Sequence, residues 1–91
     1  MPPRWEPSSE KHGVPQHDQV YAILHATYIA DLGPNDDDGE IRLYIGPEHS
    51  QTERELEILV NQFTDGREAS VFHAMRLGPK FRRYREENPH G

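Results

Sequence analysis

The apolar residues of this chain repeat with a helical period in one N-terminal segment. Val20, Leu24 and Thr27 are spaced by four and three residues, so they fall on one side of a helix. Pro15 stands just before this stripe, where a proline fits the start of a helix. The spacing therefore predicts an amphipathic helix that begins near Gln16.

Four later segments have the extended or alternating pattern of β-strands. The clearest runs from Glu40 to Gly46, where every second residue is Ile or Leu. Turns rich in Asp, Asn and Gly separate these segments, and Asp65-Gly66 favours a hairpin because Gly accepts a positive φ angle. The predicted strands are residues 28–32, 40–46, 55–60 and 68–75.

Short helices are expected on both sides of the strands. Ser8 or Ser9 can cap a helical turn that stops before Gly13, and residues 79–87 predict a last helix. We expect an α+β fold in which two N-terminal helices and one C-terminal helix cover one face of an antiparallel sheet of about four strands. The predicted domain is residues 8–87, between a proline-rich tail at 1–7 and a tail at 88–91.

Composition narrows the functional classes. The 91 residues allow one domain, and only 33% of them are apolar. The absence of cysteine excludes disulfides, thiol nucleophiles and cysteine zinc sites. No apolar run approaches the roughly 20 residues that span a membrane, and the N-terminus lacks a signal-peptide pattern. We therefore expect a cytoplasmic protein with no membrane partner.

Charge is distributed unevenly along the chain. The formal net charge is -6, yet five of the ten basic residues lie between positions 76 and 85, where no acid interrupts them. This segment carries +5, so the other 81 residues carry -11. A basic segment on an acidic body fits an anionic ligand, although the same pattern describes the solvated side of a surface helix.

Three of the six histidines are candidates for chemistry. His12 ends the first turn, His25 lies on the predicted helix, and His73 shares one predicted strand face with Val71 and Met75. A zinc site formed by the three histidines is a third reading, but no pair has the i, i+4 spacing of zinc-protease helices. We expect no metal and no cofactor.

The basic segment supplies candidate phosphate ligands. Lys80 and Tyr84 are four residues apart, so they share one side of the predicted last helix, and Arg76, Arg82 and Arg83 flank them. RNA cleavage without a metal needs a base for the 2′-hydroxyl, a cation for the phosphorane and an acid for the 5′-oxygen. Histidine, lysine, arginine and tyrosine can fill these roles.

Five short motifs occur along the chain from about residue 5 to residue 84. They are Trp5-Glu6, Lys11-His12-Gly13, His25-Ala26, Ile45-Gly46-Pro47 and the segment from His73-Ala74-Met75 through Pro79-Lys80-Phe81 to Tyr84. Together they resemble the BrnT-type toxins of bacterial toxin–antitoxin pairs, and in particular a group of small actinobacterial toxins. The C-terminal motif is the most specific part of this resemblance.

This resemblance implies a RelE/BrnT-like fold and a metal-independent RNA endonuclease that inhibits translation. It implies RNA as the substrate and a cognate antitoxin as the partner, in a homodimer or a toxin–antitoxin hetero-oligomer. The implied catalytic candidates are His73, Lys80, Tyr84, His12 and His25, and the implied phosphate ligands are Arg76, Arg82 and Arg83. His73 is the first candidate for the base or acid, and Lys80 is the first for transition-state stabilisation.

The residues leave a different functional class open. A domain of the same fold can act without catalysis, as a protein-interaction or regulatory module. The two readings differ at His73 and Lys80, because only a nuclease needs these side chains for its activity.

Overall fold

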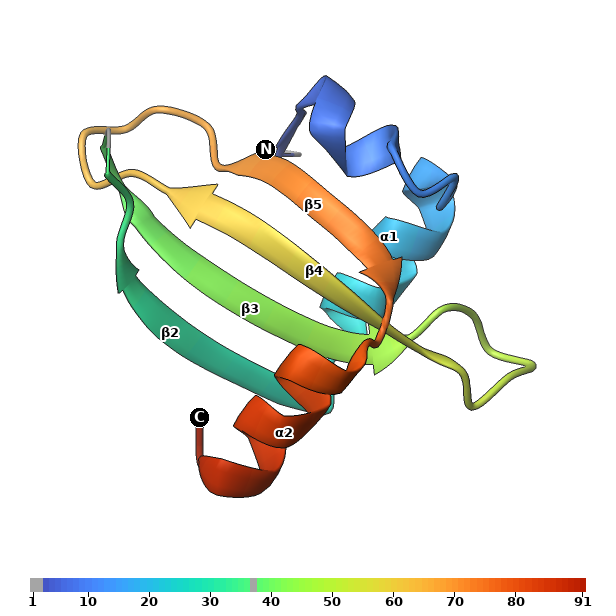
Figure 1. The fold of residues 1–91 in the computed structure, drawn as a ribbon. Coiled ribbons are helices and arrows are strands. Elements are labelled where there is room, and N and C mark those ends of the chain that lie inside the picture. Colours follow the sequence, from blue (N-terminus) through green and yellow to red (C-terminus); the bar gives the residue numbers. More distant parts are fainter. Residues whose placement is uncertain (1–2, 37) are drawn as a thin grey trace.

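Five strands form one sheet, which two helices and a 3-10 helix accompany (Figure 1). The computed structural model describes residues 3–36 and 38–91. The elements are β1 (Arg4–Trp5), the 3-10 helix η1 (Pro7–Glu10), α1 (Gln16–Leu24), β2 (Tyr28–Pro34), β3 (Glu40–Pro47), β4 (Glu55–Gln62), β5 (Ser70–Arg76) and α2 (Pro79–Glu87).

The strand order is β1-β5-β4-β3-β2, so the predicted antiparallel meander of four strands is confirmed. A fifth strand differs from the prediction, because β1 pairs in parallel with β5 at the sheet edge. The Arg4 amide donates to the Ala69 carbonyl at 2.7 Å, and Trp5 packs on the core. The predicted tail over residues 1–7 therefore does not include Arg4 and Trp5; residues 1 and 2 lie outside the described residues.

The two helices lie on opposite faces of the sheet (Figure 1), so the expected cover on one face is wrong. On one face Ala22 of α1 packs with Leu56 and Ile58. On the other face Phe81 of α2 packs with Leu43 and Ile45. We call these the α1 face and the α2 face. A sheet covered on both sides needs apolar residues at odd and even strand positions, and β4 has them in Leu56, Ile58, Leu59 and Val60.

A β-bulge in β5 changes the face on which a histidine lies. Leu59 pairs with His73 and Val60 pairs with Val71, so Phe72 is an extra residue in the ladder. Val71 consequently packs on the α1 face, whereas His73 lies on the α2 face beside Glu57. The predicted alignment of Val71 with His73 on one face is therefore wrong, because simple alternation does not hold across a bulge.

The helix boundaries agree with the sequence in part. Helix α2 has the predicted bounds, and α1 begins at Gln16 as expected but ends at Leu24. The first turn is a 3-10 helix with Pro7 at its start and no side-chain cap, so the serine cap is wrong. No helix among residues 3–36 and 38–91 is long and apolar enough to cross a membrane.

Gly46 lets α1 approach β3 very closely. A Cβ atom at this position would collide with the Ala22 carbonyl oxygen and would lie 3.0 Å from the Ala26 Cα. No side chain therefore separates the strand from the helix here, and glycine is required for steric reasons. The Ile45-Gly46-Pro47 motif thus has a structural explanation in the packing of α1.

Candidate active site

A buried carboxylate occupies the α2 face next to the beginning of α2. Glu57 of β4 is only 4% exposed. Its Oε2 lies 2.8 Å from His73 Nε2, and its Oε1 accepts the Gly78 backbone N–H at 2.8 Å. Each oxygen thus has a hydrogen-bonding partner, which removes most of the cost of burying the charge. Glu57 joins β4, β5 and α2 at one point.

Two histidines meet at this point from distant parts of the sequence. The His12 and His73 rings are 5.7 Å apart between centroids and lie edge to face, with 77° between their planes. The His73 side chain is 25% exposed, and His12 is exposed on the turn after η1. Gly13, with a positive φ of 74°, closes the turn directly after His12 by donating its N–H to the Glu10 carbonyl. The pair is therefore accessible from solvent, and one of its members is held by a buried acid.

Lys80 lies in the first turn of α2, two residues after Gly78. Its side chain is exposed, and Nζ is 5.2 Å from the Phe81 ring centroid. Because Glu57 binds both His73 and Gly78, the strand with the histidine and the helix with the lysine are fixed to the same carboxylate. Glu57 therefore links the helix that carries Lys80 to the strand that carries His73.

The other two catalytic candidates have different surroundings. His25 stacks on Tyr21 at 4.1 Å between centroids, at the end of α1. Tyr84 is half-buried against the apolar cluster of the α2 face. Among the described residues no hydrogen bond or ring contact joins either of them to His73. The structure thus brings His12 and His73 together, and it does not bring His25 or Tyr84 to them.

Two of the three arginine candidates line a small groove at the end of β5. This groove, of about 300 Å³, is called the smaller groove below. Its lining residues are Arg54, Arg76, Arg82, Glu53, Glu55 and Leu77. Arg83 is exposed and does not line it. Three guanidinium groups around one concave surface favour an anion, although two carboxylates partly offset their charge.

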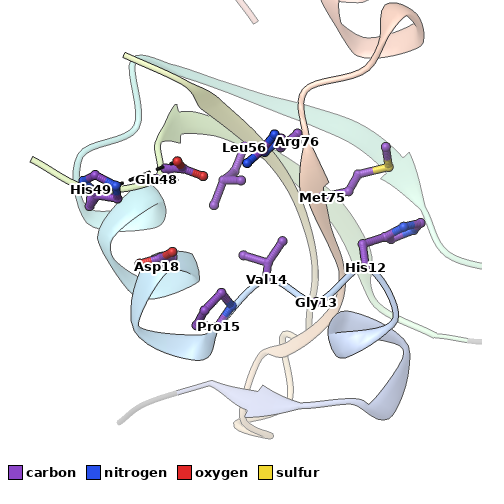
Figure 2. Close-up of a pocket in the computed structure, with 10 residues that line it drawn as sticks. All are labelled: His12, Gly13, Val14, Pro15, Asp18, Glu48, His49, Leu56, Met75 and Arg76. Carbon is purple, nitrogen blue, oxygen red and sulfur yellow. Dashed lines mark ion pairs between the residues drawn. The ribbon is translucent and has the colours of Figure 1, made fainter. Parts of the chain in front are cut away.

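A larger groove, of about 570 Å³, lies beside β5 and α1 (Figure 2). In Figure 2 Arg76 lies beside Leu56, whereas Met75 projects from the opposite side of β5, where His12 of the turn after η1 also lies. Glu48 faces this groove and lies 3.1 Å from Arg54 Nε. The two grooves share Arg76, which therefore stands between them.

The structure gives no metal centre among residues 3–36 and 38–91. No group of three or more His, Asp or Glu side chains in this part of the chain could hold a metal ion. The three histidines of the alternative zinc site do not come together: His12 and His73 contact each other, whereas His25 stacks on Tyr21. The chemistry available at the histidine pair is proton transfer.

Sequence reasoning missed Glu57. In the segment Glu55-Leu56-Glu57-Ile58 it occupies a polar position of an alternating strand, which indicates a solvated side chain. The position is buried because α2 covers this face as well. The available signal was the apolar residue Leu59 on the same face, which breaks the alternation and predicts a strand buried on both sides.

Comparisons with known proteins give no identification for this arrangement. Neither a protein-family model, nor a curated protein, nor a solved structure matches the chain. The resemblance to BrnT-type toxins therefore stays a prediction that rests on the motifs themselves.

Proposed function

We propose that this protein is a metal-independent RNA endonuclease, and that His12 and His73 are its acid–base pair. The observation that carries the proposal is the meeting of two accessible imidazoles, one of them bonded to a buried carboxylate. Two imidazoles can serve as base and acid in one reaction, because one accepts a proton while the other donates one. A purely structural histidine does not need a second one beside it.

The reaction is an internal transesterification. His73 takes the proton of the 2′-hydroxyl, and the 2′-oxygen attacks the adjacent phosphorus. The bond from phosphorus to the 5′-oxygen breaks, and His12 gives its proton to that oxygen. The products are a 2′,3′-cyclic phosphate and a 5′-hydroxyl, so no co-reactant is needed. Lys80 stabilises the negative charge that develops on the phosphorane oxygens.

Arginines near the end of β5 support binding of the RNA backbone. Arg76 and Arg82 share the smaller groove, where each can form a paired hydrogen bond with a phosphate. Arg83 is exposed on α2 and can contact a neighbouring phosphate. The local charge of +5 in residues 76–85 is opposite in sign to that of the chain as a whole.

The biological role we propose is that of a cytoplasmic toxin with a RelE/BrnT-like fold, neutralised by a cognate antitoxin. The five-stranded, mostly antiparallel sheet supports that fold, whereas the two helices on opposite faces depart from the one-sided cover expected for it. The motif resemblance supports the role, because its His12 and His73 are the two histidines that meet.

The test is RNA cleavage by the purified chain in the presence of EDTA. We expect cyclic-phosphate products from the wild type, and a rate at least about 100-fold lower for His73→Ala or His12→Ala, the usual size of a general acid or base effect. His17→Ala and His90→Ala are matched controls, because both histidines are exposed and, among the described residues, neither ring stacks on His12 or His73. Cleavage that requires a metal, or that survives His73→Ala, would overturn the proposal.

A protein-interaction role is the second candidate, and exposed apolar residues favour it. Leu24 is 75% exposed, and Val20 lies four residues earlier on the same side of α1. Ile29 is also exposed, and its ladder partner Tyr44 packs on the α1 face. If binding alone is the function, Leu24→Asp abolishes the cellular phenotype, while His73→Ala and Lys80→Ala leave it unchanged.

A further inference from the structure

The buried Glu57 has a part in the chemistry that goes beyond satisfying a polar group. On the basis of the proposed function, we infer that Glu57 is a positioning residue that keeps the proton of neutral His73 on Nε2, so that Nδ1 is the atom that accepts the proton of the 2′-hydroxyl. Glu57 itself touches no substrate in this scheme. Its contribution is to select the tautomer and the orientation of the ring.

Hydrogen-bonding capacity determines the tautomer. An ionised carboxylate can only accept hydrogen bonds, so the proton in the 2.8 Å contact between Glu57 and His73 belongs to Nε2. The alternative tautomer would set the lone pair of Nε2 against a carboxylate that is 94% shielded from solvent, and such an unsatisfied pair is costly. Among the described residues no hydrogen bond reaches Nδ1, which leaves that nitrogen available.

Two hydrogen bonds hold the Glu57 carboxylate in its orientation. Its second oxygen accepts the Gly78 N–H, and Gly78 is the residue at which α2 begins. Turning the carboxylate would break two hydrogen bonds at once and would expose a backbone donor without a partner. The His73 ring is therefore oriented by a group that the fold itself holds.

The same contact sets the place of Lys80 relative to His73. No neighbouring side chain caps the start of α2. Glu57 of β4 takes this role, because its carboxylate accepts the N–H of the N-cap residue Gly78. A shift of the carboxylate would move the first turn of α2 and Lys80 with it. Glu57 thus aligns the proton-accepting and charge-stabilising groups together.

The experiment measures the tautomer directly, by ¹⁵N NMR of the histidine side chains of the intact chain at a pH where His73 is neutral. We expect the wild type to carry its proton on Nε2. In Glu57→Gln the amide oxygen can still accept from Gly78, but the amide N–H points at His73 and moves the proton to Nδ1. The cleavage rate of bound RNA should fall by about 10²–10⁴-fold, the usual size of a general acid–base contribution, with RNA affinity retained.

Glu68→Gln is the matched control, because Glu68 is exposed and lies just before β5, the strand that carries His73. A wild-type His73 with its proton on Nδ1 overturns the inference, whether or not Glu57→Gln folds. So does a Glu57→Gln protein that folds, changes tautomer and cleaves RNA at the wild-type rate. An inactive wild type with an Nε2 proton that moves in the variant would instead disprove the proposed nuclease function and leave the positioning contact intact.

Discussion

The two faces of the sheet are built differently, although β4 contributes to both. The α1 face is apolar at its centre, where Leu56, Ile58 and Val71 are fully buried. The α2 face has an apolar cluster of its own, but the same face also buries the charged Glu57 and half-buries His73. The polar pair stands where β4, β5 and the start of α2 meet.

This difference indicates a division of tasks. A dry face contributes stability through burial, and its residues tolerate exchange for others of similar volume. A face that buries a carboxylate hydrogen-bonded to an imidazole has less apolar burial to contribute, and its polar groups restrict the side chains around them. Four substitutions test this division, beginning with the one of largest expected effect.

Ile58→Ala removes a fully buried side chain from the α1 face. The lost burial and the cavity that remains should lower the free energy of unfolding by about 2–5 kcal/mol. Urea denaturation measures this change. Val20→Ala on the exposed side of α1 is the control, with an expected change within about 0.5 kcal/mol. Equal losses in the two variants would show that the α1 face is not the main source of stability.

His73→Ala tests the polar end of the α2 face. The buried Oε2 of Glu57 would lose its partner, and an unsatisfied buried acceptor costs about 1–3 kcal/mol of unfolding free energy. The same denaturation measurement applies, with His90→Ala as the control. An unchanged stability would mean that water replaces the imidazole fully, and that the pair is retained for activity alone.

Tyr28→Phe tests a titratable residue in the apolar cluster of the α2 face. The Tyr28 hydroxyl donates to the Asn88 carbonyl at 2.6 Å, and its loss should cost about 0.5–1.5 kcal/mol at neutral pH. Burial raises the pKa of Tyr28, so the unfolded chain ionises first. Stability is therefore complete below the ordinary tyrosine pKa of about 10 and declines as the pH rises through the higher folded value.

Unfolding curves recorded from about pH 8 to about pH 11.5, on both sides of the ordinary tyrosine pKa, measure this decline. It should be shallower in Tyr28→Phe than in the wild type. Tyr21→Phe on α1 is the matched control and should keep the wild-type slope. A decline of the same steepness in Tyr28→Phe would assign the effect to another group.

Gly78→Ala should have the smallest effect. Its φ of -98° suits any residue, and a new Cβ would lie 3.4 Å from Glu57 Oε1, which is ordinary contact. Restricting the unfolded chain favours alanine, whereas the N-cap position of α2 favours glycine, so the stability should change by no more than about 0.5 kcal/mol. Gly66→Ala is the opposite control, because φ of 90° there strains an alanine. A destabilised Gly78→Ala with less cleavage would show that the carboxylate has no room to yield.

The sequence predicted those elements that rest on local patterns. Alternation identified β3 and β4, and Gly78-Pro79 set the start of α2, because strand period and chain breakers act over a few residues. The two residues of β1 have no period, and only their pairing with β5 defines them. The side on which each helix packs was equally beyond local reasoning, since α2 has the single buried anchor Phe81.

The candidate site was predictable by residue type but not by arrangement. His12 and His73 were named from motifs, yet 60 positions separate them along the chain. Their contact depends on the bulge at Phe72, which turns His73 to the α2 face. A bulge follows from how two strands meet, so the isolated β5 sequence does not contain it. Glu57 was missed for a different reason: the packing of α2 buries it, and the signal for that burial was Leu59 on the same face.

The close contact at Gly46 has a consequence for the larger groove. Asp18 on α1 and Glu48, two residues beyond the glycine, both line that groove. Because backbone rests on backbone at Gly46 and Ala22, the main chain and not a side-chain rotamer sets the distance between α1 and β3 beside the groove. A single methyl group at position 46 would act as a spacer, and it would widen the groove without altering any residue that lines it.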